Sequence, residues 1–288
     1  GLVDRVAASL QRDGLAPGAA IALCGLSTPW QAVVFLGALR AGVVVAPLAA
    51  SVTPADFAAM LADAQAQALF LDATAAALMP PNGQLRCIAL DAAAPGQAFE
   101  AWLAPPGTRP KPVALTPEAP FNIIYSSGTT GRPKGIVQPH GMRWMHVQRG
   151  ARYGYGPGKI TLLATPLYSN TTLVVFFPSL AFGGTVVLMS KFDAAAYLAL
   201  AQAHRVTHTM LVPVQYQRLL ALPSFDDFDL SAFEMKFCTS APFSAELKRR
   251  VLERWPGGLT EFYGMTEGGG TCILDAHLHP DKLHTVGR

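Results

Sequence analysis

Apolar and polar positions follow two different patterns along the first 120 residues, one with helical periodicity and one of short apolar runs. Three stretches carry apolar residues at helical spacing, and each is followed by a short apolar run that is typical of a buried strand. Ser51 and Thr53 supply capping signals before the third helix. The pattern predicts helices at 2–13, 30–40 and 54–63, and strands at 19–24, 43–47 and 68–71. This alternation favours right-handed crossovers and a mainly parallel sheet.

The alternation of predicted helices and strands is interrupted at 104–120, where the proline content predicts an extended surface connector. It then resumes, with strands predicted at 121–125, 159–165, 208–212 and 259–263, and helices at 141–150, 192–204 and 245–255. We therefore predict an α/β fold of two stacked αβαβα-type subdomains with mainly parallel sheets. The predicted subdomains cover residues 1–149 and 150–288.

The longest apolar stretch, 171–190, is long enough by length alone to cross a bilayer. However, Pro178 and the Gly183–Gly184 pair are expected to divide it into a short helix, a turn and a valine-rich strand. Buried segments of parallel sheets have this composition, so we predict no membrane span.

Composition supports a buried core and narrows the choice of partners. Hydrophobic residues make up 51% of the chain and charged residues 14%, which excludes a disordered protein. The net charge of +3 comes from scattered lysines and arginines, so nucleic acid is not an expected partner. The four cysteines lie far apart without CxxC spacing, which favours a reducing, cytoplasmic location.

The strongest chemical signal is the loop at 125–135, Tyr-Ser-Ser-Gly-Thr-Thr-Gly-Arg-Pro-Lys-Gly, which directly follows a predicted strand. Small hydroxyl donors, exposed amides beside glycines and the Lys134 ammonium suit the binding of a polyphosphate. The loop does not match the Walker pattern G-x-x-x-x-G-K-[ST], so the usual nucleotide-hydrolase fold is not supported. The alternative interpretation is an ordinary surface loop rich in serine and glycine.

This loop resembles the signature phosphate loop of the AMP-forming adenylating superfamily, which includes acyl-CoA synthetases, peptide-synthetase adenylation domains and beetle luciferases. Three further segments follow in the family's order. The segment 263–267, Tyr-Gly-Met-Thr-Glu, resembles its Y-G-x-T-E motif, and 238–243, Cys-Thr-Ser-Ala-Pro-Phe, resembles its S-G-A-A-P-L segment. The segment 165–170, Thr-Pro-Leu-Tyr-Ser-Asn, lies where the family has a P-L-F-H-like stretch. The resemblance covers essentially the whole chain.

The resemblance implies ATP-dependent activation of a small carboxylic acid, with pyrophosphate release and later transfer to coenzyme A. It assigns catalysis to Lys134, Thr266 and Glu267, and a Mg²⁺ contact to Ser127 and Glu267. It places the nucleotide contacts on a larger set of residues: Ser126, Ser127, Gly128, Thr129, Thr130, Gly131, Thr239, Ser240, Ala241, Glu261, Phe262, Tyr263 and Gly264. It places the acid pocket on four residues: Tyr168, Ser169, Val212 and Gly268. The glycines after Glu267 either widen this pocket or only permit a tight backbone path.

Several positions depart from the family pattern. Thr239 occupies a position where the family has glycine, and Ser169 replaces a histidine of many acyl-CoA synthetases. No aspartate lies between Thr165 and Thr172, which disfavours an α-amino acid substrate. We expect a core without the family's β-barrel subdomain and C-terminal lid, and therefore no turnover by this chain alone. A module that loads a carrier protein and a non-catalytic nucleotide-binding fragment are the alternatives.

Overall fold

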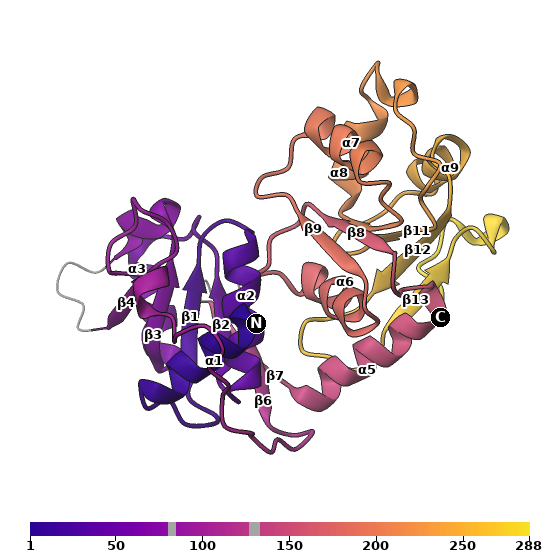
Figure 1. The fold of residues 1–288 in the computed structure, drawn as a ribbon. Coiled ribbons are helices and arrows are strands. Elements are labelled where there is room, and N and C mark those ends of the chain that lie inside the picture. The colour runs from indigo at the N-terminus through magenta and orange to yellow at the C-terminus, as the bar shows by residue number, and fades with distance from the viewer. Residues whose placement is uncertain (80–84, 127–132) are drawn as a thin grey trace. The chain divides into compact units, whose positions relative to one another are not determined.

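The computed structural model describes residues 1–79, 85–126 and 133–288. These residues form two compact units, Gly1–Arg143 and Trp144–Arg288, each built on its own sheet (Figure 1). The division falls within helix α5 (His140–Gly150), as does the predicted one between residues 149 and 150. The predicted α/β class with two mainly parallel sheets is confirmed.

The first unit contains strands β1 (Ala20–Cys24), β2 (Val44–Leu48), β3 (Ala66–Leu71), β4 (Arg86–Ala89), β5 (Gln97–Ala98), β6 (Pro120–Ser126) and β7 (Lys134–Pro139). Its helices are α1 (Leu2–Arg12), α2 (Pro29–Arg40), α3 (Pro54–Asp63), the 3₁₀ helix η1 (Ala73–Leu78) and α4 (Phe99–Trp102). The strands lie in the order β5-β4-β3-β1-β2-β6-β7, and β7 pairs antiparallel while the others pair parallel.

Helices of the first unit begin where side chains can satisfy the first free amides. Thr28 accepts a hydrogen bond from the Gln31 amide at 3.3 Å, and Thr53 accepts one from the Asp56 amide at 3.1 Å. In both helices proline occupies the first position, where no amide donor is needed. The third helix therefore has the limits that the sequence predicted.

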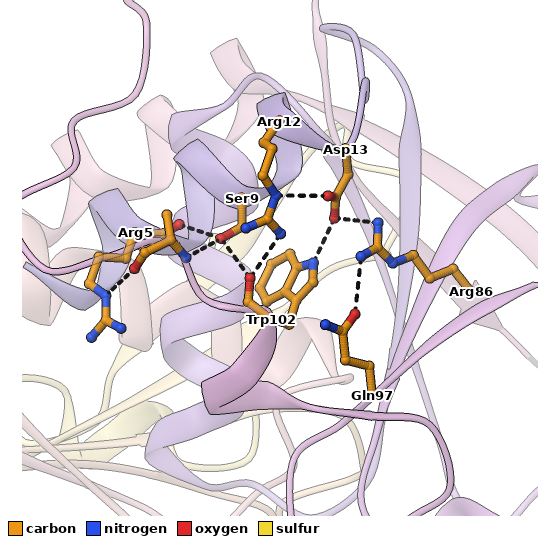
Figure 2. Close-up of polar contacts among 8 residues, drawn as sticks. Arg5, Ser9, Arg12, Asp13, Arg86, Gln97 and Trp102 are labelled. Atoms are coloured by element: carbon orange, nitrogen blue, oxygen red, sulfur yellow. Dashed lines mark hydrogen bonds and ion pairs between the residues drawn. The ribbon is translucent and has the colours of Figure 1, made fainter.

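Helix α1 is held by the polar cluster shown in Figure 2. Asp13, at its C-terminal end, accepts a hydrogen bond from Trp102 Nε1 at 2.6 Å and forms an ion pair with Arg86 at 2.7 Å. Burial acts to raise the pKa of Asp13, but the hydrogen bonds from Trp102 and Arg12 and the charge of Arg86 outweigh it and lower the pKa. Ser9 Oγ accepts from the Ala104 amide at 2.7 Å. These contacts attach the first helix to β4 and to the segment that follows β5.

The second unit contains strands β8 (Ile160–Leu163), β9 (Thr185–Leu188), β10 (His208–Leu211), β11 (Met235–Cys238), β12 (Gly258–Tyr263) and β13 (Cys272–Asp275). Besides α5, its helices are α6 (Asn170–Ala181), α7 (Ala194–Ala203), α8 (Pro213–Leu220) and α9 (Ala245–Arg254). The strands lie in the order β13-β12-β11-β10-β8-β9, with β13 antiparallel to β12 and the others parallel.

The parallel parts of the two sheets share one topology. β2-β1-β3-β4-β5 in the first unit corresponds to β9-β8-β10-β11-β12 in the second. In each sheet the second of these strands along the chain lies on one side of the first strand and the next three lie on the other side; in the first sheet β6 then pairs with β2 on the original side. Ligands of open α/β sheets bind at the carboxyl ends of the strands where this reversal occurs. In the second unit that position lies between β8 and β10.

The apolar stretch 171–190 forms α6 and β9. The predicted division into a helix, a turn and a valine-rich strand is confirmed. The break falls at the Gly183–Gly184 pair, whereas Pro178 lies within α6, which continues to Ala181. Pro178 packs on Gly150, where an added Cβ would lie only 2.7 Å from the proline Cβ. Tertiary packing of this apolar helix thus outweighs the loss of one backbone donor. Within the described parts of the chain, no helix combines the length and apolar character needed to cross a bilayer.

The core of the second unit is centred on Trp255, which is fully buried. Its indole makes edge-on contacts with the rings of Tyr216, Phe225 and Phe233, at centroid distances of 5.8, 5.7 and 4.9 Å. These aromatic residues come from α8, from the segment after it and from the connection to β11. The cluster therefore packs α8, the segment after it and the connection to β11 around the residue that follows α9.

Candidate active site

The predicted site residues of the second unit follow the carboxyl ends of parallel strands. Tyr168 and Ser169 follow β8, Val212 follows β10, and Thr239 to Ala241 follow β11. Glu261 to Tyr263 form the end of β12. Because β8, β10, β11 and β12 run parallel, these four segments meet at one edge of the sheet, beside the reversal of strand order.

The connection from β8 to α6 is fixed by hydroxyl groups. Ser169 is the N-cap of α6, and its side chain accepts a hydrogen bond from the Thr171 amide at 3.3 Å. Thr172 Oγ1 lies 2.7 Å from Thr165 Oγ1 and 2.6 Å from the carbonyl oxygen of Pro166. At the position where many acyl-CoA synthetases have histidine, this chain therefore uses a side chain that starts a helix.

Gln215, which sequence reasoning missed, joins the ends of β8 and β10. Its Oε1 accepts from the Val212 amide at 3.0 Å, and its Nε2 donates to the carbonyl of Ala164 at 3.2 Å. Gln215 is the third residue of α8, so its contact with Val212 is one half of a capping box. The Val-Pro-x-Gln spacing was the available signal. This residue fixes the predicted pocket position Val212.

The loop after β11 has an unusual backbone conformation at Ser240. Its φ is 78°, in the left-handed region that favours glycine, whereas Thr239 does not have a positive φ. Ser240 Oγ lies 2.5 Å from Thr171 Oγ1, so the loop after β11 contacts the first turn of α6 across the end of β10. The threonine that departs from the family pattern is therefore accommodated without backbone strain.

Glu261 is engaged inside the second unit. Its Oε2 lies 2.5 Å from Nζ of Lys248 on α9, and the two side chains are only 4% and 1% exposed. Burial raises the pKa of Glu261, and the hydrogen bond and charge of Lys248 oppose this rise without cancelling it. The Glu261 carboxylate is thus engaged by Lys248, and Glu261 itself lies inside β12, paired with Cys238 on β11 and Leu274 on β13.

The segment after β12 is exposed. Tyr263 is 62% exposed at the end of the strand, and the Gly268 amide donates to the carbonyl of Met265 at 3.2 Å, which closes a turn. Gly268 has a φ of 92°, so the turn itself requires glycine there. Glu267 lies exposed in this turn, and no described residue forms an ion pair or hydrogen bond with its carboxylate.

In the first unit, the two strands that flank the predicted phosphate-binding loop are described. The register pairs Ser126 on β6 with Lys134 on β7, so both lie at the end of the hairpin next to the loop, and Lys134 is exposed. The remaining predicted loop residues lie outside the described residues: Ser127, Gly128, Thr129, Thr130 and Gly131.

One step below that pair, Tyr125 faces Gly135. The Tyr125 hydroxyl donates to Asp63 Oδ2 at 2.7 Å, and a Cβ on Gly135 would lie 2.8 Å from the same oxygen. Burial and the neighbouring Asp63 carboxylate raise the pKa of Tyr125. Asp63, at the end of α3, therefore contacts both strands of the hairpin, and Gly135 leaves the space that this contact needs.

The sequence profile of the AMP-binding enzyme family matches residues 2–288. This chain belongs to that family. The chain is 30% identical over 292 residues to the indoleacetate–CoA ligase of Aromatoleum aromaticum. This alignment covers 97% of the chain and 56% of the relative. The chain is 37% identical over 170 residues to a feruloyl-CoA synthase of an Amycolatopsis species, with 57% of the chain and 34% of the relative covered.

Among solved structures, the chain is similar to the amide bond synthetase McbA from Marinactinospora thermotolerans, with a TM-score of 0.89 and 28% sequence identity. The superposition covers all of this chain and 59% of the McbA chain. The chain thus spans about a third to just over half of the length of these relatives.

The side chains that could bind a metal ion in this chain suit a cation whose other ligands are phosphate oxygens of a bound nucleotide and water. Within 1–79, 85–126 and 133–288, no group of three or more His, Cys, Asp or Glu side chains is arranged to hold a metal ion. Mg²⁺ takes one or two carboxylates and completes its shell with phosphate oxygens and water. The exposed carboxylate of Glu267 fits that requirement, whereas the Glu261 carboxylate is already paired with Lys248.

Proposed function

We propose that this AMP-binding enzyme chain carries the nucleotide- and acid-binding part of an ATP-dependent carboxylic acid ligase. A carboxylate oxygen of the acid attacks the α-phosphorus of ATP, the new P–O bond forms, and the bond to pyrophosphate breaks. The products are an acyl-adenylate and pyrophosphate. The observation that carries this proposal is the convergence of four predicted site segments at one edge of the second sheet, beside its reversal of strand order.

In this proposal the protein acts by positioning and by charge, and it needs no nucleophile of its own. Lys134 and the hydroxyl-rich loop bind the phosphates, Thr266 contacts the α-phosphate, and Tyr263 offers its exposed ring to adenine. Glu267 and Ser127 would hold Mg²⁺, which when bound offsets the charge of the phosphates. The exposure of Lys134, Tyr263 and Glu267 supports these roles.

We propose an aromatic carboxylic acid that is not an α-amino acid as the substrate. Two relatives are named for ferulate and indoleacetate, and both names describe an aromatic ring with a short carboxylate side chain. In the whole protein, the thiol of coenzyme A would then attack the acyl carbon, and AMP would leave. Transfer to a carrier protein is the alternative. A cytoplasmic location is part of the proposal, and all four cysteines are unbridged.

The test measures pyrophosphate release from ATP·Mg²⁺ with ferulate, indoleacetate, fatty acids and amino acids, using both this chain and the complete reading frame that contains it. We expect release with an aromatic acid by the complete protein, and no coenzyme A thioester from this chain alone. Lys134→Ala and Glu267→Ala should abolish release. Lys191→Ala and Glu253→Ala, which change exposed residues of the same charge outside the site, should not.

Two results would contradict the proposal. If the complete protein binds no ATP·Mg²⁺, the nucleotide site does not exist. If the control variants lose as much activity as the site variants, the loss reports general damage and the assigned roles are wrong.

A further inference from the structure

Lys236 and Lys248, both in the second unit, are fully buried, and each ammonium group contacts backbone carbonyls. Lys236 donates to carbonyls of Trp255, Pro256 and Gly257, where β12 begins. Lys248 Nζ donates to the carbonyls of Leu283 and Thr285, at 2.9 and 2.8 Å, and also forms the ion pair with Glu261. Lys236 thus binds the backbone just before β12 begins, and Lys248 binds Glu261 toward the other end of β12.

The Lys248 ammonium contacts both segments that are proposed to bind adenine. Glu261 lies on β12, two positions before Tyr263. Phe243 closes the segment 238–243, and its ring centre lies 5.7 Å from Lys248 Nζ. Phe243 also stacks on Tyr216, with centroids 5.4 Å apart and an interplanar angle of 16°. A single cation therefore joins the end of β12 to the loop after β11.

The same ammonium also attaches the strand on the other side of β12. The carbonyls of Leu283 and Thr285 precede Arg288, whose own carbonyl accepts from the Ile273 amide on β13 at 3.0 Å. Ile273 in turn faces Phe262 in the antiparallel β12–β13 pair. Lys248 is thus linked to both neighbours of the segment 262–264.

A buried ion pair costs so much desolvation that it often adds little to stability, and apolar residues of similar volume can replace it. In some proteins such a pair instead fixes one geometry, because a misplaced charge would remain unpaired inside the protein. We propose that Lys248 is a positioning residue for the adenine nucleotide. Through Glu261 and Phe243 it sets the position of residues 262–264 relative to the loop 239–241.

This inference rests on the proposed nucleotide-binding function, and its test separates the adenine contact from the phosphate contact. The double variant Lys248→Met/Glu261→Gln removes the charge pair without leaving either charge unpaired. Binding of ATP·Mg²⁺ and of Mg²⁺ tripolyphosphate, which lacks adenine, would be measured by titration calorimetry, together with kcat and KM for ATP in the complete protein.

We expect the double variant to bind ATP about tenfold more weakly and to show a KM for ATP raised to the same extent, with kcat changed less than about twofold. Its affinity for tripolyphosphate should stay unchanged. Glu261→Gln alone is the second variant. It leaves Lys248 held by carbonyls, as Lys236 already is, and should show the same selective loss. Lys236→Met is the matched control and should leave both affinities unchanged.

Unchanged ATP affinity in both variants, or equal losses for ATP and tripolyphosphate, would overturn the positioning role. Failure of the unmodified protein to bind either ligand would instead overturn the proposed function, and the inference with it.

Discussion

Replacing Lys236 by methionine is expected to remove part of the pH dependence of this protein's stability. Lys236 is fully buried on β11, and desolvation lowers its pKa from 10.5 to about 7. In the unfolded chain the lysine keeps its ordinary pKa, so the unfolded state binds more protons between about pH 7 and 10.5. The free energy of unfolding therefore rises with pH across that window and levels off below pH 7.

The size of the effect follows from the two pKa values. A pKa difference of one between the folded and unfolded states corresponds to about 1.4 kcal/mol of unfolding free energy. The difference for Lys236 is roughly 3.5 (10.5 minus about 7), so the free energy of unfolding should rise by about 5 kcal/mol over the whole pH window. Between pH 7 and 9 the expected gain is about 2 kcal/mol, because near pH 7 the buried amine is only half deprotonated. Methionine at position 236 binds no proton and lacks this gain.

The assay is urea unfolding of the unmodified protein and the Lys236→Met variant at pH 7, 8 and 9, followed by circular dichroism and tryptophan fluorescence. The difference between the two proteins isolates Lys236, because both contain the same tyrosines and cysteines. Lys191→Met, which replaces an exposed lysine, serves as the control and should show no such difference.

A difference that is constant from pH 7 to 9 would refute this reasoning. It would mean that the carbonyls of Trp255, Pro256 and Gly257, at 3.0, 2.5 and 2.8 Å from Nζ, stabilise the ammonium enough to cancel its desolvation.

Two further predictions concern packing. Gly135→Ala is expected to destabilise the protein by about 1–3 kcal/mol, because the new Cβ would lie 2.8 Å from Asp63 Oδ2. Thermal unfolding of Gly135→Ala, Asp63→Ala and the double variant would measure the energetic coupling between the two positions. If the destabilisations of the single variants simply add in the double variant, the clash with Asp63 is not the cause. Trp255→Ala is expected to cost about 3–5 kcal/mol in urea unfolding, since the indole fills the centre of the second core between rings that include Tyr216 and Phe233. Trp255→Phe should cost less, and equal costs for both variants would argue against loss of packing volume.

Local sequence signals predicted the elements that depend on neighbouring residues. Helix α3 has the predicted limits, 54–63, because Thr53 caps it and Pro54 fits its first position. The family assignment came from short motifs whose residue types report their own chemistry, and it is confirmed. The alternation of strands and helices was enough to predict two mainly parallel sheets.

Elements without such local signals were missed. The sequence interpretation did not include strands β4, β5, β7, β11 and β13 or helices α4 and α8. β7 and β13 pair antiparallel at sheet edges, and β11 is a short strand buried between β10 and β12. The helix–turn–strand division of 171–190 was predicted, but only the structure shows that α6 runs through Pro178, which packs on Gly150, and ends before Gly183. In each case a contact with a distant segment decides the conformation.

The sequence by itself determined the class of fold, the family and the residue types available for phosphate, adenine and cation. The tertiary structure decided which of these side chains are already engaged. Glu261 lies on β12, the strand that leads into the Y-G-x-T-E segment, yet the partner of its carboxylate is Lys248 on helix α9. Ser240 adopts a conformation typical of glycine, and its hydroxyl contacts Thr171. These pairings depend on strand order and helix placement, which bring together residues that lie far apart in the chain, and no local pattern encodes them.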